Sequence, residues 1–101
     1  MFINVIKTYR TVVALCDKEI IGKKFEQGHL QLDLKESFYK GEEGKQISEA
    51  EAIDSMIAFS NEDATFNIVG KKSVQAALKA GVIEKEGVKT VQSIPFALSL
   101  M

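Results

Sequence analysis

Two short segments of this chain place a glycine directly before a pair of lysines. The first is Gly22-Lys23-Lys24 and the second is Gly70-Lys71-Lys72, and in each a glutamine and a leucine follow at the same spacing. Glycine lets an anion approach the backbone closely, and the paired ammonium groups supply positive charge. The sequences around the two segments share nothing else, so they do not indicate an internal duplication. The pattern predicts two places where the protein meets phosphate.

The second segment gives the sharper physical signal. Residues 64–69 are typical of a strand and residues 71–80 of a helix, so Gly70 stands where the helix begins. The first turn of a helix offers free backbone amides and the positive end of the helix dipole, and both favour an anion. Lysines are unfavourable there unless an anion lies between them. We therefore expect Gly70 and the amides after it to cradle a phosphate beside Lys71 and Lys72; in the alternative, both lysines point into solvent.

The first segment has a different context. Asp17 is a plausible N-cap for a short helix that ends at Gly22, which would put Lys23 and Lys24 at a helix C-terminus. Lysines complement the free carbonyl groups at that end, so a structural role is the alternative to phosphate binding. If Phe25 were exposed it would help to stack a base; otherwise it belongs to the core.

Cys16 and His29 are the single cysteine and the single histidine of the chain. A cysteine near a helix N-terminus can have a lowered pKa and react, whereas a cysteine on an apolar strand is more often simply packed. One cysteine and one histidine cannot supply the four ligands of a structural zinc site. We expect no metal and no cofactor. An enzyme that acts on a small phosphorylated substrate at Cys16 or Asp17 is the least favoured hypothesis for function.

Composition favours one soluble globular domain over residues 1–101, since 46% of residues are hydrophobic and 27% are charged. No apolar run approaches the roughly 20 residues of a membrane helix, so we expect a cytoplasmic protein without membrane contact. Residues 42–63 carry seven acidic residues against one lysine, which predicts an acidic side. That stretch contains a helix over 48–60, opened by the capping box of Ser48 and Glu51. Its acids would suit a basic protein partner, which is the alternative function.

The order of expected elements predicts an α+β fold, a two-layer sandwich of short, mainly antiparallel strands with two main helices. Pro95 should break the chain between the last two strands, and residues 35–47 should form a loop. The expected strands cover residues 2–8, 11–16, 29–34, 64–69, 88–93 and 96–100, and the main helices cover 48–60 and 71–80.

Five motifs in order give the chain a family resemblance. They are Val13-Ala14-Leu15-Cys16-Asp17, Ile21-Gly22-Lys23-Lys24-Phe25, Ser37-Phe38-Tyr39-Lys40-Gly41-Glu42, Asn67-Ile68-Val69-Gly70 and Ile94-Pro95-Phe96-Ala97. Together they resemble the domain of unknown function 424 family, a group of small, mostly archaeal proteins, over nearly the whole chain. The resemblance implies a two-layer α+β sandwich and a translation-associated, RNA-binding role. The positions that carry the family pattern are Cys16, Asp17, Gly22, Lys23, Lys24, Phe25, Ser37, Phe38, Tyr39, Gly41, Asn67, Gly70 and Pro95.

Two departures from the family pattern bear on function. The family often has a histidine after the closing proline, where this chain has Phe96, which weakens a catalytic role at that position. It often has an acid after the second glycine, where this chain has Lys71 and Lys72. The second lysine pair is therefore a feature of this protein more than of its relatives.

The leading hypothesis is a small module that binds RNA, with RNA or the ribosome as its partner. Lysines 23, 24, 71 and 72 would contact phosphates, and Gly70 would help to cradle one of them. Asn67 and Tyr39 would meet a base or a ribose. The low net charge of -1 predicts modest, strongly salt-dependent affinity.

Overall fold

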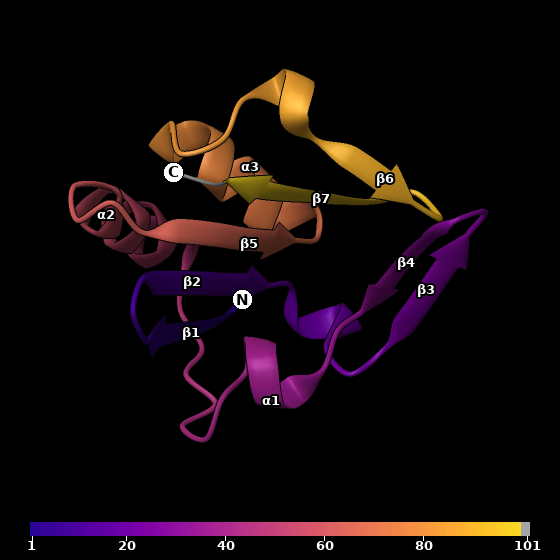
Figure 1. Ribbon diagram of the computed structural model, residues 1–101, viewed down its shortest axis with the longest axis horizontal. Helices are drawn as coiled ribbons and strands as arrows, with labels where there is room; N and C mark the ends of the chain where they lie inside the picture. The colour runs from indigo at the N-terminus through magenta and orange to yellow at the C-terminus, as the bar shows by residue number, and fades with distance from the viewer. Residues whose placement is uncertain (100–101) are drawn as a thin grey trace.

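The computed structural model of the chain describes residues 1–99. Its main sheet has five strands in the order β1-β2-β5-β7-β6, and a hairpin of β3 and β4 forms a separate pair (Figure 1). The strands are β1 (Phe2–Lys7), β2 (Thr11–Cys16), β3 (Lys24–Gln27), β4 (Leu30–Asp33), β5 (Thr65–Val69), β6 (Lys89–Val91) and β7 (Ile94–Ser99). The helices are α1 (Glu36–Tyr39), α2 (Glu49–Ser60) and α3 (Lys71–Ala80), with 3-10 turns η1 (Lys18–Ile20) and η2 (Lys85–Gly87).

One strand pair of the main sheet is parallel. β2 and β5 run in the same direction, whereas β1 with β2, β5 with β7, and β6 with β7 are antiparallel. Parallel neighbours need a long crossover connection, and here the chain between them contains the hairpin, α1 and α2. Both strands therefore end at the same end of the sheet, on the right in Figure 1.

The two main helices cover one face of the sheet. Side chains of a strand alternate between faces, and Leu15, Phe66 and Ile68 point toward α2 and α3 and are almost fully buried. They pack against Met56 of α2 and Val74 of α3, among others, in the larger of two apolar clusters. The prediction of a two-layer α+β fold with two main helices is confirmed.

The hairpin and α1 cover part of the opposite face, near the end where β2 and β5 stop. Leu32 of β4, Leu34 and Tyr39 of α1 are buried there in a second cluster with Cys16 and Val91. The tip of the hairpin is held at the far edge of the sheet, where Gln27 Oε1 accepts the amide of Gln92 at 2.7 Å. The hairpin thus spans the sheet end instead of projecting from it (Figure 1).

Local signals located α2 and α3 well. Ser48 caps α2, and both hydrogen bonds of the expected capping box are present, with Glu51 N–H donating to Ser48 Oγ at 3.2 Å. The bond from the amide of Ser48 lowers the pKa of the Glu51 carboxyl. Two large apolar residues of these helices, Ile57 and Leu78, are exposed.

Other expectations were wrong. Residues 35–47, expected to form a loop, include the short helix α1. Earlier in the chain, β3 forms where no strand was expected. Pro95 was expected to break the chain, but it lies inside β7. Its carbonyl accepts the amide of Gly70 at 2.8 Å, and this bond needs no amide from the proline, so the strand tolerates a proline there. Leu100, expected to end the last strand, lies outside the described residues.

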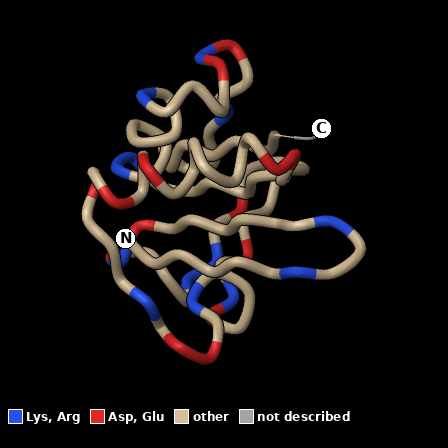
Figure 2. The backbone as a smooth tube through the Cα atoms, turned by 90° about the vertical axis from the view of Figure 1, so that its left-hand side faces the viewer, with Lys and Arg blue, Asp and Glu red and all other residues tan. Residues whose placement is uncertain are grey.

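Charges are less segregated than expected. Basic and acidic segments are interspersed along the backbone in Figure 2. Two acids of α2 are already engaged in contacts within the protein. Glu51 belongs to the cap, and Glu49 Oε1 accepts a hydrogen bond from Lys79 Nζ of α3 at 2.7 Å. No single acidic side stands out in this view.

Replacement of the cap residue should measure its contribution. Ser48→Ala should lower stability by about 1 kcal/mol, the usual loss for a serine cap, and the melting temperature by about 4–8 °C. The control is Ser60→Ala on the same helix, since within residues 1–99 the Ser60 side chain makes no hydrogen bond. Thermal unfolding followed by circular dichroism would contradict the assignment if both variants melted alike.

Candidate functional site: the strand ends and the open sheet face

The ends of β2 and β5 and the start of β7 meet at one junction. Asp17 follows β2, and its amide donates to the carbonyl of Val69 at 3.1 Å. Gly70 follows β5, and its amide donates to the carbonyl of Pro95 at 2.8 Å. The helix α3 begins directly after Gly70, so three strands and one helix terminus converge on a few residues.

The side chain of Asp17 caps α3 from across this junction. Its Oδ2 accepts the amide of Lys72 at 3.0 Å, and its Oδ1 accepts both the amide and the hydroxyl of Ser73, at 2.8 and 2.7 Å. Ser73 is fully buried and Asp17 is only 7% exposed. These bonds satisfy free amides of the first turn and place a negative charge at the positive end of the helix dipole.

Gly70 makes room for that carboxylate. Its φ is +109°, and a Cβ added there would lie 2.6 Å from each of the two carboxylate oxygens of Asp17. Any other residue would therefore meet both backbone strain and a steric clash.

The expected phosphate cradle at Gly70 was wrong, because a carboxylate of the protein already occupies it. The amides of Lys72 and Ser73 that were to hold the phosphate are engaged by Asp17. The anion preference of this helix terminus was correctly inferred, but its ligand is internal. The Lys71 and Lys72 side chains remain exposed.

The two lysine pairs emerge at the same end of the sheet. Lys72 Nζ lies 3.3 Å from Glu19 of η1, the turn that leads to Lys23. Lys24 Nζ lies 3.8 Å from Glu26 Oε1, and both of these ion pairs are exposed and therefore weak. Lys23 makes no ion pair within residues 1–99.

The first lysine pair was expected at a helix C-terminus, but it does not lie at one. The turn η1 ends at Ile20, and Lys24 already belongs to β3. The amide of Gly22 donates to the carbonyl of Leu34 at 2.7 Å, which joins the base of the hairpin to the segment before α1. Phe25 on the same strand packs against the second core cluster.

Cys16 is not available as a nucleophile in this structure. Its side chain is fully buried, and its thiol donates to the carbonyl of Asp17 at 3.5 Å. Burial, with a smaller contribution from the charge of Asp17, raises the pKa of the Cys16 thiol to about 12. The thiolate that catalysis would need is therefore scarce at neutral pH.

Tyr39 does not reach a ligand either, contrary to expectation. It is 8% exposed, and burial raises the pKa of its hydroxyl to about 12. Its ring meets Phe38 edge-on, with ring centres 4.9 Å apart. Ser37 is exposed on α1, while Gly41 packs its backbone against Asn4, whose amide donates to the carbonyl of Phe38 at 2.7 Å.

Asn67 lies on the sheet face opposite the helices. It is paired in register with Ala14 and Leu98, and its neighbours Phe66 and Ile68 point the other way into the helix-facing core. It is half-buried, and its side-chain amide has no hydrogen-bond partner among residues 1–99. Its carbonyl oxygen and amino group are therefore available to accept and donate hydrogen bonds to a ligand.

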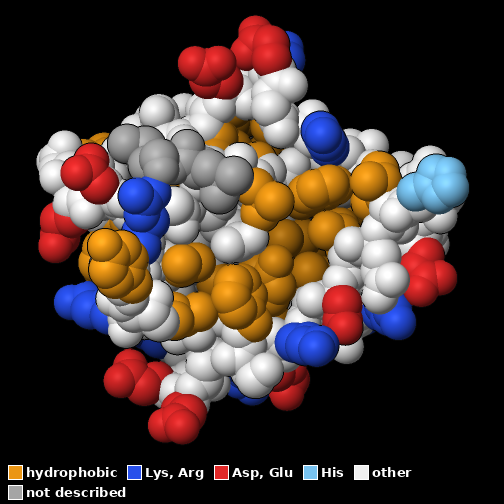
Figure 3. Space-filling model, viewed as in Figure 1, with side chains coloured by type: hydrophobic (Ala, Val, Ile, Leu, Met, Phe, Trp, Pro, Cys, Tyr) orange, Lys and Arg blue, Asp and Glu red, His pale blue; other side chains and the backbone are white. Residues whose placement is uncertain are grey.

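The face around Asn67 is open and apolar over its middle. Figure 3 shows hydrophobic side chains gathered there, and Leu98 is 60% exposed. None of the strands of the main sheet contributes an acid to it, whereas the register places Lys89 and Phe96 on it. Sequence reasoning missed Phe96, Leu98 and Lys89, because only the register of β7 brings them beside Asn67. We call Asn67, Phe96, Leu98 and Lys89 the open-face group.

Within residues 1–99, no helix is both long and apolar enough to cross a bilayer. In the same part of the chain, His, Cys, Asp and Glu nowhere gather in groups of three or more that could hold a metal ion.

The comparisons agree with this architecture. A model of the family described as protein of unknown function (DUF424) matches residues 6–100, so the chain belongs to that family. An uncharacterized conserved protein from Methanopyrus kandleri, known from its crystal structure, shares the fold with a TM-score of 0.82. The two are 20% identical, and the match covers 96% of this chain and 87% of the other. No curated protein matches the sequence.

The contact between Asp17 and α3 can be tested by a double-mutant cycle. Asp17→Ala should cost about 3 kcal/mol, because buried donors of Lys72 and Ser73 lose their acceptor. Gly70→Ala should cost at least about 1–3 kcal/mol from backbone strain, with the clash in addition. The double variant should lose less than the sum, since the new methyl group no longer meets a carboxylate.

Gly87→Ala is the matched control. A Cβ there has no neighbour within 4 Å, so its effect should stay within about 0.5 kcal/mol. Urea denaturation gives the four free energies of unfolding. Strict additivity of the two single changes would show that Gly70 is not required by the carboxylate.

Proposed function

We propose that this protein is an RNA-binding module associated with translation. The observation that carries the proposal is the unpartnered Asn67 amide on a sheet face to which the strands of the main sheet contribute no acid, near the end where both lysine pairs emerge. Unpaired bases are recognised by side chains that hydrogen-bond base edges and by flat apolar surfaces, and phosphates by lysines. An RNA ligand would put the protein in the cytoplasm.

The lysines would contact the phosphates of the RNA, and the open-face group would contact its bases. Lys23 is free of ion pairs within residues 1–99, as is Lys71, so a phosphate need not displace an acid from either. Phe96 offers a half-buried ring and Asn67 a donor and an acceptor on the same face. Of the two residues expected to meet a base or ribose, Tyr39 is buried and Asn67 remains available.

The alternative, a protein-binding surface on the acidic helix α2, draws less support. Glu51 is used in the capping box and Glu49 is paired with Lys79. Asp54 is the one acid of α2 left outside these contacts. A basic partner would find little free negative charge on this helix.

One variant tests whether both lysine pairs meet the same RNA. Lys23→Gln combined with Lys71→Gln should weaken binding to a labelled single-stranded RNA of mixed sequence, measured by fluorescence anisotropy between about 50 and 200 mM salt. The slope of log affinity against log salt should fall by about 1.4, or about 0.7 for each lost phosphate contact. Lys79→Gln with Lys85→Gln removes the same charge elsewhere and should leave the slope unchanged. Equal slopes for both double variants, or no binding at low salt, would refute the proposal.

A second variant separates base contact from phosphate contact. Asn67→Ala should weaken single-stranded RNA binding about tenfold without changing the salt slope, because the lost group is neutral. Thr90→Ala on β6, an exposed strand residue whose side chain faces the other way, should have no effect. A loss of affinity that also lowers the salt slope would contradict base contact by Asn67.

A further inference from the structure

The outer edge of β1 is only partly paired. β1 is the first strand of the sheet, and beyond it the chain returns once, at the bridge of Phe2 with Gln46. Around this bridge the amide of Ile3 donates to the carbonyl of Lys45 at 3.1 Å, and the amide of Ile47 donates to the carbonyl of Met1 at 2.9 Å. The returning segment therefore runs antiparallel to β1 and pairs only with its beginning.

The next backbone groups of this edge are open. Backbone groups alternate in direction along a strand, so the amide and carbonyl of Val5 point outward, as the amide of Ile3 does. Within residues 1–99 no strand pairs with them there. Gly44, directly before Lys45, has a φ of +58°. The turn at this glycine keeps the residues before it from continuing along the edge of β1. An exposed edge of this kind is a template for another extended chain.

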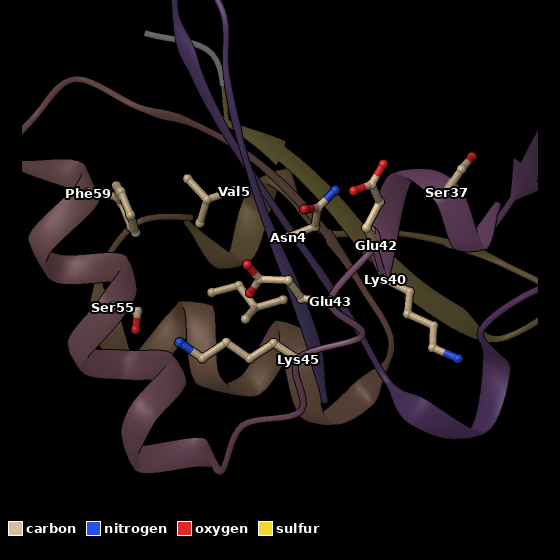
Figure 4. Close-up of a pocket in the computed structure, with 11 residues that line it drawn as sticks. Asn4, Val5, Ser37, Lys40, Glu42, Glu43, Lys45, Ser55 and Phe59 are labelled. Carbon is tan, nitrogen blue, oxygen red and sulfur yellow. The ribbon is translucent and has the colours of Figure 1, made fainter.

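A groove of about 550 Å³ runs beside this open edge. Figure 4 shows it between β1, the loop of residues 40–45 and α2, with Val5 and Phe59 among the residues that line it. Ile3, Val5 and Phe59 give it an apolar floor on the helix side of the sheet. A side chain opposite Val5 in an added strand would point to this floor, because paired residues share a face.

The charge at the groove selects the kind of segment. Glu42 and Glu43 line it, and neither makes an ion pair within residues 1–99. Lys40 and Lys45 line the groove as well, but Lys40 lies with its Nζ over the Phe2 ring at 5.3 Å, and Lys45 extends toward Ser55 of α2 (Figure 4). Two free carboxylates beside an apolar floor suit an apolar residue flanked by lysine or arginine.

We propose that the open edge of β1 binds an extended basic segment of a partner protein by strand addition opposite Asn4–Lys7. Backbone hydrogen bonds to Val5 give affinity, the apolar floor takes one side chain, and Glu42 and Glu43 contact its basic neighbours. A second copy of this chain fits less well, because pairing of two β1 edges would bring the same carboxylates of both copies together. This groove is separate from the proposed RNA surface.

The probe is an acetylated, amidated peptide of alternating lysine and valine, titrated into ¹⁵N-labelled protein and followed by NMR. We expect saturable shifts centred on the amides of Val5 and Glu43, and slower hydrogen exchange of the Val5 amide. Absence of a saturable shift at Val5, or shifts centred elsewhere, would overturn the proposal. So would concentration-dependent dimerisation of the protein alone that protects the Val5 amide.

Two variants separate the backbone and charge contributions. Val5→Pro removes the outward amide while leaving the ladder to β2, and it should abolish peptide binding with the fold retained by NMR. Glu42→Lys with Glu43→Lys should weaken binding at least about tenfold and create binding to the corresponding glutamate–valine peptide. Glu84→Lys with Glu86→Lys makes the same charge change elsewhere and should preserve affinity. Equal losses in both charge variants would overturn the proposal, whether or not Val5→Pro folds.

Discussion

The buried carboxylate of Asp17 at the start of α3 is the contact on which the rest of the structure depends. It joins the end of β2 in the sheet to the first turn of a helix in the other layer, through bonds to Lys72 and Ser73. It also dictates glycine at position 70, since any side chain would enter the space of the carboxylate. A charge so little exposed is tolerable because its oxygens are satisfied by amides and a hydroxyl.

The residues that carry the family pattern fall into three groups. Cys16, Asp17, Gly70 and Pro95 belong to the junction, where their atoms are buried or engaged in bonds between strand ends and the helix. Residues such as Tyr39 and Gly41 stabilise the layer that covers the second face of the sheet. The third group has accessible side chains and includes Lys23, Lys24, Ser37 and the half-buried Asn67; the chain's own Lys71 and Lys72 are exposed as well. The accessible residues, rather than the whole pattern, are therefore the ones to which a ligand can be assigned.

Sequence patterns predicted the features whose causes are local. Ser48 and Glu51 define the start of α2 by their spacing alone, and the extent of α3 followed from its periodicity. The cap of α3 could not be found this way, because its acceptor lies 56 residues from Ser73 along the chain. β3 was missed because most of its residues are polar and exposed, without the alternation that indicates a strand. The open face around Asn67 depends on the register of β7, which no short pattern specifies.

The parallel pairing of β2 with β5 has a consequence for how the chain reaches this structure. The long connection between them must close before Asp17 can meet the first turn of α3. The helix is only ten residues long and has no side-chain cap of its own at Gly70, so it gains little stability in isolation. Its first turn should thus form late, after the long connection between β2 and β5 has closed at a cost in chain entropy. Protection of the Ser73 amide would then report completion of the sheet, not the local growth of a helix.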